Sequence, residues 1–152
     1  IALEVRKAQV YGILVSDAGA SDFSAAFGLH FRNQAGVIVY DFFSDDNKDL
    51  TFDAGEEIST HQLAEGNVVS EVCTYTDLSG NGEVCLFPGG TESIDILFKR
   101  PEPAARITNS TSGSTLLAEA DIVVVSSIGD RMRTVKVFGS GQVSVGSTVN
   151  TP

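Results

Sequence analysis

The sequence predicts an α+β fold in which one N-terminal helix packs on a following antiparallel β-sheet, or on two such sheets. Two patterns lead to this prediction. Residues 1–16 are mostly good helix formers with apolar side chains at helical spacing. Residues 27–145 show short alternating segments separated by turn signals. With 152 residues, 42% of them hydrophobic, we expect one globular domain over 1–152, with a helix at 1–16 and a β-domain at 27–152.

The predicted helix is apolar around more than half of its girth. A wide apolar face requires a large partner, which a β-sheet would supply. Residues 17–24 are rich in Gly, Ser and Asp and are expected to form the loop that ends the helix. Two apolar stripes run along the helix: Ile1, Val5, Ala8, Gly12 and Val15 form one, and Leu3, Val10 and Leu14 form the other.

Strands are expected in the rest of the chain. Turn residues at 33–36, 64–67, 79–82 and 139–141 indicate hairpins. Pro101 and Pro103 should end the strand before them or confine it to an edge. The Ser/Thr-rich segment 108–115 is expected to be a loop. The predicted strands cover residues 27–32, 37–43, 58–63, 68–75, 93–99, 120–127, 133–138 and 142–145.

The acidic segment 45–57 is the most informative part of the chain, because it places oxygen-bearing side chains on alternate residues. This is the ligand spacing of an EF-hand-type calcium loop, since a loop that curls around a cation turns alternate residues inward. Thr51 would contribute its carbonyl, Glu56 a bidentate carboxylate, and Phe52 an apolar anchor. The expected calcium ligands are Asp45, Asn47, Asp49, Thr51, Asp53 and Glu56.

Two features set this loop apart from a helix–loop–helix calcium sensor. Leu50 occupies the sixth slot, where a left-handed turn normally requires Gly. The segment before the loop is typical of a strand rather than a helix. We therefore expect an EF-like loop on a β-scaffold; the alternative is a solvated acidic turn without an ion.

The two cysteines, Cys73 and Cys85, flank a Ser-Gly-Asn-Gly turn signal. If the flanks pair as a hairpin, the two sulfur atoms come together, so we predict a disulfide. The alternatives are two buried free thiols or a two-ligand metal site. His30 and His61 are too distant in sequence to complete a convincing zinc set.

The charge balance and the absence of catalytic motifs exclude several function classes. A net charge of −10 argues against nucleic-acid binding, which selects basic faces. No segment is long and apolar enough to span a bilayer. His30 and His61 lie in predicted strands without a recognisable nucleophile turn nearby, so we expect no enzymatic activity.

Three segments carry a resemblance to a known family. Residues 4–12 resemble the second half of the long N-terminal helix of type IV pilins and type II secretion pseudopilins, especially the minor H-type pseudopilins. Residues 96–101 resemble a strand of that group. Residues 133–145 resemble its closing hairpin. The apolar half-helix that defines the family would precede Ile1.

The resemblance implies a structural subunit of a type IV pilus or type II secretion filament. Its partners would be other pilin or pseudopilin subunits, contacted through the N-terminal helix. It would be anchored in the inner membrane before assembly and act at the cell surface or in the periplasm. The alternative is a secreted calcium-binding β-sandwich module for adhesion or carbohydrate binding, which the lack of Trp and the scattered tyrosines disfavour.

Overall fold

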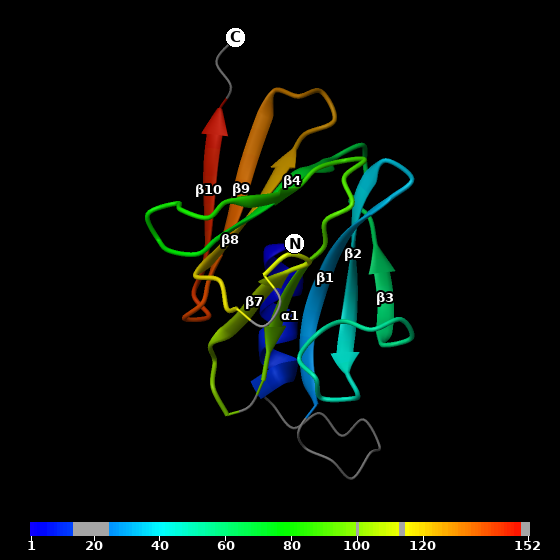
Figure 1. The fold of residues 1–152 in the computed structure, drawn as a ribbon. Coiled ribbons are helices and arrows are strands. Elements are labelled where there is room, and N and C mark those ends of the chain that lie inside the picture. The colour runs from blue at the N-terminus through cyan, green and yellow to red at the C-terminus, as the bar shows by residue number, and fades with distance from the viewer. Residues whose placement is uncertain (14–24, 100, 113–114, 150–152) are drawn as a thin grey trace.

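The computed structural model of the protein describes residues 1–13, 25–99, 101–112 and 115–149 (Figure 1). Ten strands form two five-stranded antiparallel sheets, while the single helix of the described residues has only 12 residues. The prediction of an α+β fold is therefore wrong. The fold is predominantly β, because about half of the described residues lie in the strands of two sheets and only one short helix accompanies them.

The first sheet has the strand order β3-β2-β1-β6-β7. Its long central hairpin pairs β1 with β2 through the turn at Ala35 and Gly36, both of which have positive φ. This is one of the hairpins that the sequence indicates. The strands are β1 (Ala26–Gln34), β2 (Val37–Asp45), β3 (Glu57–His61), β6 (Ile94–Phe98) and β7 (Ala105–Asn109).

The second sheet has the order β10-β9-β8-β4-β5. The Val-rich strand, β8, is central, with neighbours on both sides. The closing hairpin turns through Gly141, whose φ of 85° belongs to the left-handed region. The strands are β4 (Val68–Tyr75), β5 (Val84–Leu86), β8 (Glu119–Val125), β9 (Arg131–Phe138) and β10 (Val143–Val149).

The sequence did not predict β7. Its residues follow two prolines and run into the segment expected to be a loop, yet Ala105–Asn109 pairs with β6 along its whole length. The strand before the prolines, β6, ends at Phe98, as one of the two predicted outcomes had it, and β7 follows the prolines as the edge strand of the sheet. The last strand, β10, is also longer than the expected 142–145.

One apolar core lies between the two sheets and the helix. Because successive side chains of a strand point to opposite faces, Phe27, Leu29 and Phe31 of β1 face this core and His30 faces away from it. Residues of both sheets meet there: Ile38, Tyr40, Phe42, Ile94, Ile96, Phe98 and Ile107 from the first, and Val69, Val72, Leu86, Ala120, Ile122, Val135 and Val137 from the second.

The helix α1 (Ala2–Ile13) lies beside the second sheet and over the inner face of the first (Figure 1). Val5, Ala8 and Gly12 are its buried residues, which confirms one of the two predicted stripes. The predicted helix end at residues 14–16 and the loop at 17–24 lie outside the described residues. Because the buried stripe lies on one face of α1, the opposite face is left uncovered.

Gly12 allows α1 to approach β6 closely. A Cβ atom added at this position would stand 2.5 Å from the carbonyl oxygen of Phe98. We expect Gly12→Ala to destabilise the protein by about 1–3 kcal/mol, because overpacking against backbone outweighs the better helix propensity of Ala. Urea unfolding measures the loss. Gly146→Ala is the matched control, since the nearest atom to its Cβ is 4.0 Å away, and an equal loss in both variants would contradict the packing argument.

Candidate metal centre

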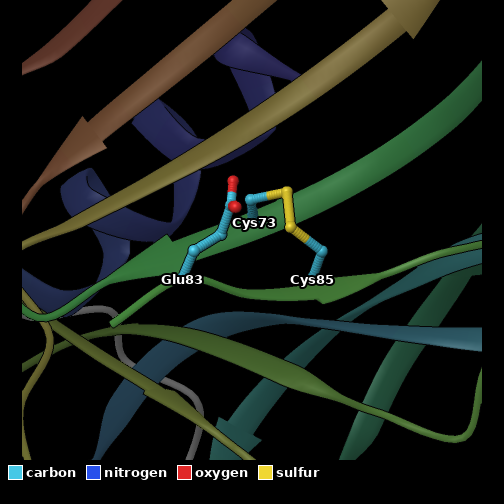
Figure 2. Close-up of side chains that lie close together, drawn as sticks. All are labelled: Cys73, Glu83 and Cys85. Carbon is cyan, nitrogen blue, oxygen red and sulfur yellow. A yellow bond between two sulfur atoms is a disulfide. The ribbon is translucent and has the colours of Figure 1, made fainter. Parts of the chain in front are cut away.

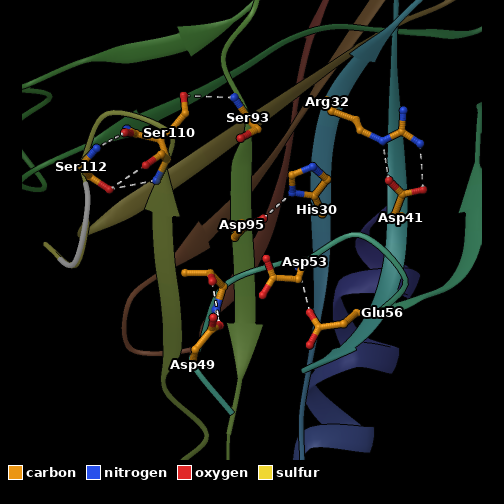
Figure 3. Close-up of polar contacts among 12 residues, drawn as sticks. His30, Arg32, Asp41, Asp49, Asp53, Glu56, Ser93, Asp95, Ser110 and Ser112 are labelled. Atoms are coloured by element: carbon orange, nitrogen blue, oxygen red, sulfur yellow. Dashed lines mark hydrogen bonds and ion pairs between the residues drawn. The ribbon is translucent and has the colours of Figure 1, made fainter. Parts of the chain in front are cut away.

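The acidic loop 46–56 connects β2 to β3 and lies on the outer face of the first sheet (Figure 3). Two of its apolar side chains hold it there. The Phe52 ring stacks on the His30 ring at 4.1 Å and meets the Phe43 ring edge-on at 5.3 Å. Leu50 packs beside Phe52 on a small buried cluster formed by Ala26, Phe43 and Leu97. Phe52 thus occupies the anchoring position that the sequence predicts for it.

Asp45 begins the loop as the last residue of β2 and is almost fully buried, with 1% of its surface exposed. Its Oδ2 accepts the N–H of Leu50 at 3.1 Å, whereas its Oδ1 has no hydrogen-bond partner among the described residues. Burial, together with the charges of Glu56 and Asp49, raises the pKa of the Asp45 carboxyl. A buried carboxylate oxygen without a donor is costly, and a bound cation would satisfy it.

Glu56 closes the loop from its other end. Its Oε1 accepts the N–H of Asp46 at 3.0 Å, and its Oε2 accepts the N–H of Asp53 at 2.9 Å. The side chain is nearly buried. Both oxygens therefore point into the curl of the loop, which is the orientation that a bidentate ligand requires.

The remaining ligand candidates are exposed and lie near one another. The Nδ2 of Asn47 donates to Asp53 at 2.7 Å and to Asp49 at 3.2 Å. The amide group thus stands between two carboxylates, where a cation would otherwise balance their charge. The hydroxyl of Thr51 donates to Asp49 at 2.7 Å, and this bond is the main cause that lowers the pKa of the Asp49 carboxyl.

The loop backbone adopts the conformation that the calcium-loop hypothesis requires at its sixth slot. Leu50 has a φ of 69° and Lys48 a φ of 67°, both in the left-handed region. Such values are unusual for residues with a Cβ, and their cost has to be offset by the surrounding contacts. Leu50 therefore departs from the calcium-loop pattern in residue type, Leu in place of Gly, but not in backbone conformation.

The carboxylates do not converge to a closed cage. Within the described residues, the compact group of potential ligand atoms, all within 4.8 Å of one another, comprises Cys73, Glu83 and Cys85 rather than members of the loop (Figure 2). The two sulfur atoms of that group are bonded to each other, so they are not available to an ion. Binding calcium in the loop would draw Asp49 and Asp53 inward and turn the Asn47 amide.

The predicted disulfide is confirmed: Cys73 and Cys85 are bonded to each other. They face each other across the β4–β5 pair, as expected for the flanks of a hairpin. The carboxylate of Glu83 lies beside the bridge and accepts a hydrogen bond from the Tyr75 hydroxyl at 3.0 Å. The burial of Tyr75, together with this contact, raises the pKa of its hydroxyl to about 12.

The two histidines lie on opposite faces of the first sheet. His30 Nδ1 is 2.6 Å from Asp95 Oδ1 beneath the Phe52 ring, a hydrogen bond seen in Figure 3. His61 Nε2 is 2.8 Å from Ser59 Oγ, and its ring stacks on Tyr40. Among the described residues no carboxylate orients His61, so this Ser–His contact lacks the third group of a nucleophilic triad.

Comparison with protein-family models, curated proteins and solved structures found no match. In the described part of the chain, no helix combines the length and hydrophobicity needed to cross a bilayer.

Proposed function

We propose that the protein is a non-catalytic structural subunit of a type IV pilus or type II secretion filament, with a calcium-stabilised loop on its outer face. One observation carries the proposal: α1 is embedded in the domain by one face only and presents apolar side chains on the other. Leu3 is 78% exposed and Val10 is 48% exposed. A helix with two apolar faces suits a subunit that packs on its own sheet and on a neighbour.

The three segments that resemble pseudopilins support the proposal because they are neighbours in space. Segment 4–12 forms most of α1, which contacts β6 through Gly12 and Phe98. On its other side, Gln9 donates to the carbonyl of Gly141 at 3.0 Å, and Arg6 donates to the carbonyl of Val143 at 3.4 Å. The resemblance therefore concentrates where the helix joins the β-domain.

The exposed stripe of α1 gives the experiment. We expect Leu3→Glu and Val10→Glu to block incorporation into filaments in the native host, because each places a charge where an apolar contact with a neighbouring subunit is proposed. The β-domain should remain folded, since neither side chain belongs to the core. Immunoblotting of sheared or over-expressed filaments measures incorporation, and circular dichroism of the purified domain measures folding.

Leu78→Glu and Ile128→Glu are matched controls, because these side chains are 70% and 81% exposed but belong to loops and not to α1. They should enter filaments normally. The proposal fails if the helix variants assemble as well as the controls. It also fails if the natural gene encodes a removable secretion signal directly before Ile1.

The alternative is a secreted calcium-binding β-sandwich module, and the two-sheet architecture favours it. A shallow groove on the first sheet, lined by Gln34, Val39, Thr60 and Gln62, offers polar groups to a ligand. Under this alternative the mature protein is found free outside the cell, and the Leu3 and Val10 variants change nothing. The location of the mature protein therefore distinguishes the two functions.

A further inference from the structure

The four edge strands of the two sheets differ in how they are protected. β5 has only three residues, β3 has five and carries Glu57, and β7 has five and follows Pro101 and Pro103. β10 has seven residues, Val-Ser-Val-Gly-Ser-Thr-Val, without a charge or a proline. Proteins normally blunt an edge with shortness, charge or proline, so among the strands that the structure describes β10 is the edge left open to pairing (Figure 1, red).

The hairpin geometry identifies which backbone groups of β10 are open. Phe138 N–H donates to the carbonyl of Gln142 at 2.9 Å, so these two residues form a hydrogen-bonded pair. Bonded and non-bonded pairs alternate along an antiparallel ladder. In the register of β9 and β10, Val143, Val145 and Ser147 therefore turn their N–H and C=O groups away from β9. The carbonyl of Val143 already accepts from Arg6, which leaves Val145 and Ser147 open within the described part of the chain.

Exposed cations stand beside this open edge, although the chain carries a net charge of −10. Arg133 lies directly across the ladder from Ser147, is exposed, and makes no hydrogen bond or ion pair within the described residues. The side chain of Arg131 is 78% exposed. Its Nε is 3.6 Å from Asp130 Oδ2, a long separation for an ion pair, so the pair is weak. Lys136, by contrast, is held by Glu119 and Asp121.

We propose that β10 accepts an extended acidic segment of a partner protein as an added strand of the second sheet. The partner's backbone would pair with Val145 and Ser147, and its carboxylates would face Arg133 and Arg131. A second copy of this chain fits less well, because its own edge would bring the same arginines and another net charge of −10. This inference does not rest on the proposed filament role.

The test uses two synthetic peptides, acetylated Thr-Glu-Val-Glu-Val-Glu-Thr amide and the same peptide with Lys in place of Glu. Amide hydrogen exchange is followed by NMR on the whole domain. We expect the Glu peptide to slow exchange at Val145 and Ser147 and leave Val135 unchanged. The Lys peptide should bind at least about tenfold more weakly, as should the Glu peptide to Arg133→Glu, because several exposed ion pairs are lost or reversed.

Ser147→Pro removes one of the open donors and should abolish binding, whereas Ser147→Thr keeps the N–H group and should bind normally. Should Ser147→Pro fail to fold, two Glu peptides, one with N-methylated glutamate amides and one with N-methylated valine amides, test the same backbone pairing against the unchanged protein, since one of the two sets must face β10. Equal binding of the Glu and Lys peptides, or no protection at Val145 and Ser147, overturns the proposal. Protection that rises with protein concentration alone assigns the edge to a second copy and overturns it too.

Discussion

Adding calcium is expected to raise the melting temperature of the protein, and chelation is expected to lower it. A ligand that binds only the folded state stabilises it by mass action, and a calcium concentration one hundred times the Kd contributes about 2.7 kcal/mol. For a domain of this size that corresponds to about 5–10 °C. The reason lies at Asp45, whose buried Oδ1 has no partner among the described residues. Differential scanning fluorimetry from chelator to millimolar calcium measures the shift.

Relative to the wild type, Asp45→Asn should be equally or more stable without calcium and less stable with calcium. The variant keeps an acceptor for the Leu50 N–H but removes the buried charge. Without calcium it should be as stable as the wild type or more stable by about 1–3 kcal/mol, since an unsatisfied buried charged group is relieved. With calcium it should be less stable, because the cation loses an anionic ligand. Such a crossover is not expected of a residue that only packs.

Asp46→Asn is the matched control, because Asp46 is exposed and its side chain is not among the expected ligands. This variant should respond to calcium as the wild type does. The calcium hypothesis is abandoned if the wild type melts at one temperature across the titration, or if Asp45→Asn and Asp46→Asn respond alike. In that case the solvated acidic turn is the better description.

Removing the disulfide is expected to cost about 3 kcal/mol, the loop-closure value for a bridge of this span in the chain-entropy model. The bridged residues are 12 apart in sequence. The double variant Cys73→Ala/Cys85→Ala should therefore melt about 6–12 °C below the wild type. Reductant should lower the wild type by a similar amount and leave the variant unchanged. Thermal melts of both proteins with and without reductant, together with intact mass after alkylation, check this.

The calcium response serves as the control for this prediction. The bridge belongs to the second sheet and the acidic loop covers the first, so their contributions should add. The double variant should therefore keep the full calcium shift. Alkylation of both thiols in the untreated wild type would show that the bridge does not form in solution. Loss of the calcium shift would show that the two sheets are coupled more tightly than their separation suggests.

Strands with a strong alternation of apolar and polar residues were predicted from the sequence. Features that depend on which strands pair were missed. β4 was placed correctly because turn signals bound it on both sides. β7 was missed because its alternation, Ala105 and Ile107 against Arg106 and Thr108, is short and follows two prolines, and pairing with β6 makes this segment a strand. The division into two sheets, which the prediction left open beside a single sheet, is also a matter of pairing, and periodicity does not encode which strands become neighbours.

The candidate site was predictable in its residues and less so in its surroundings. Alternate spacing singled out Asp45 and Glu56, and the structure shows both directed into the loop. That Asp45 is buried while Asp49 is exposed could not be read from spacing, because exposure depends on how the folded loop lies against the first sheet. The open edge at β10 escaped sequence analysis for the same reason: an edge is defined only by the absence of a neighbour in the sheet.

The docking of Phe52 and Leu50 has a consequence for the kinetics of the protein. The loop is attached to the outer face of the first sheet by few apolar contacts, whereas the main core lies on the other face. Such a segment opens and recloses in local excursions that leave the sandwich intact. An ion held in the loop would then stabilise only the docked state of the loop. It would lengthen the interval between openings without altering how the two sheets come together during folding.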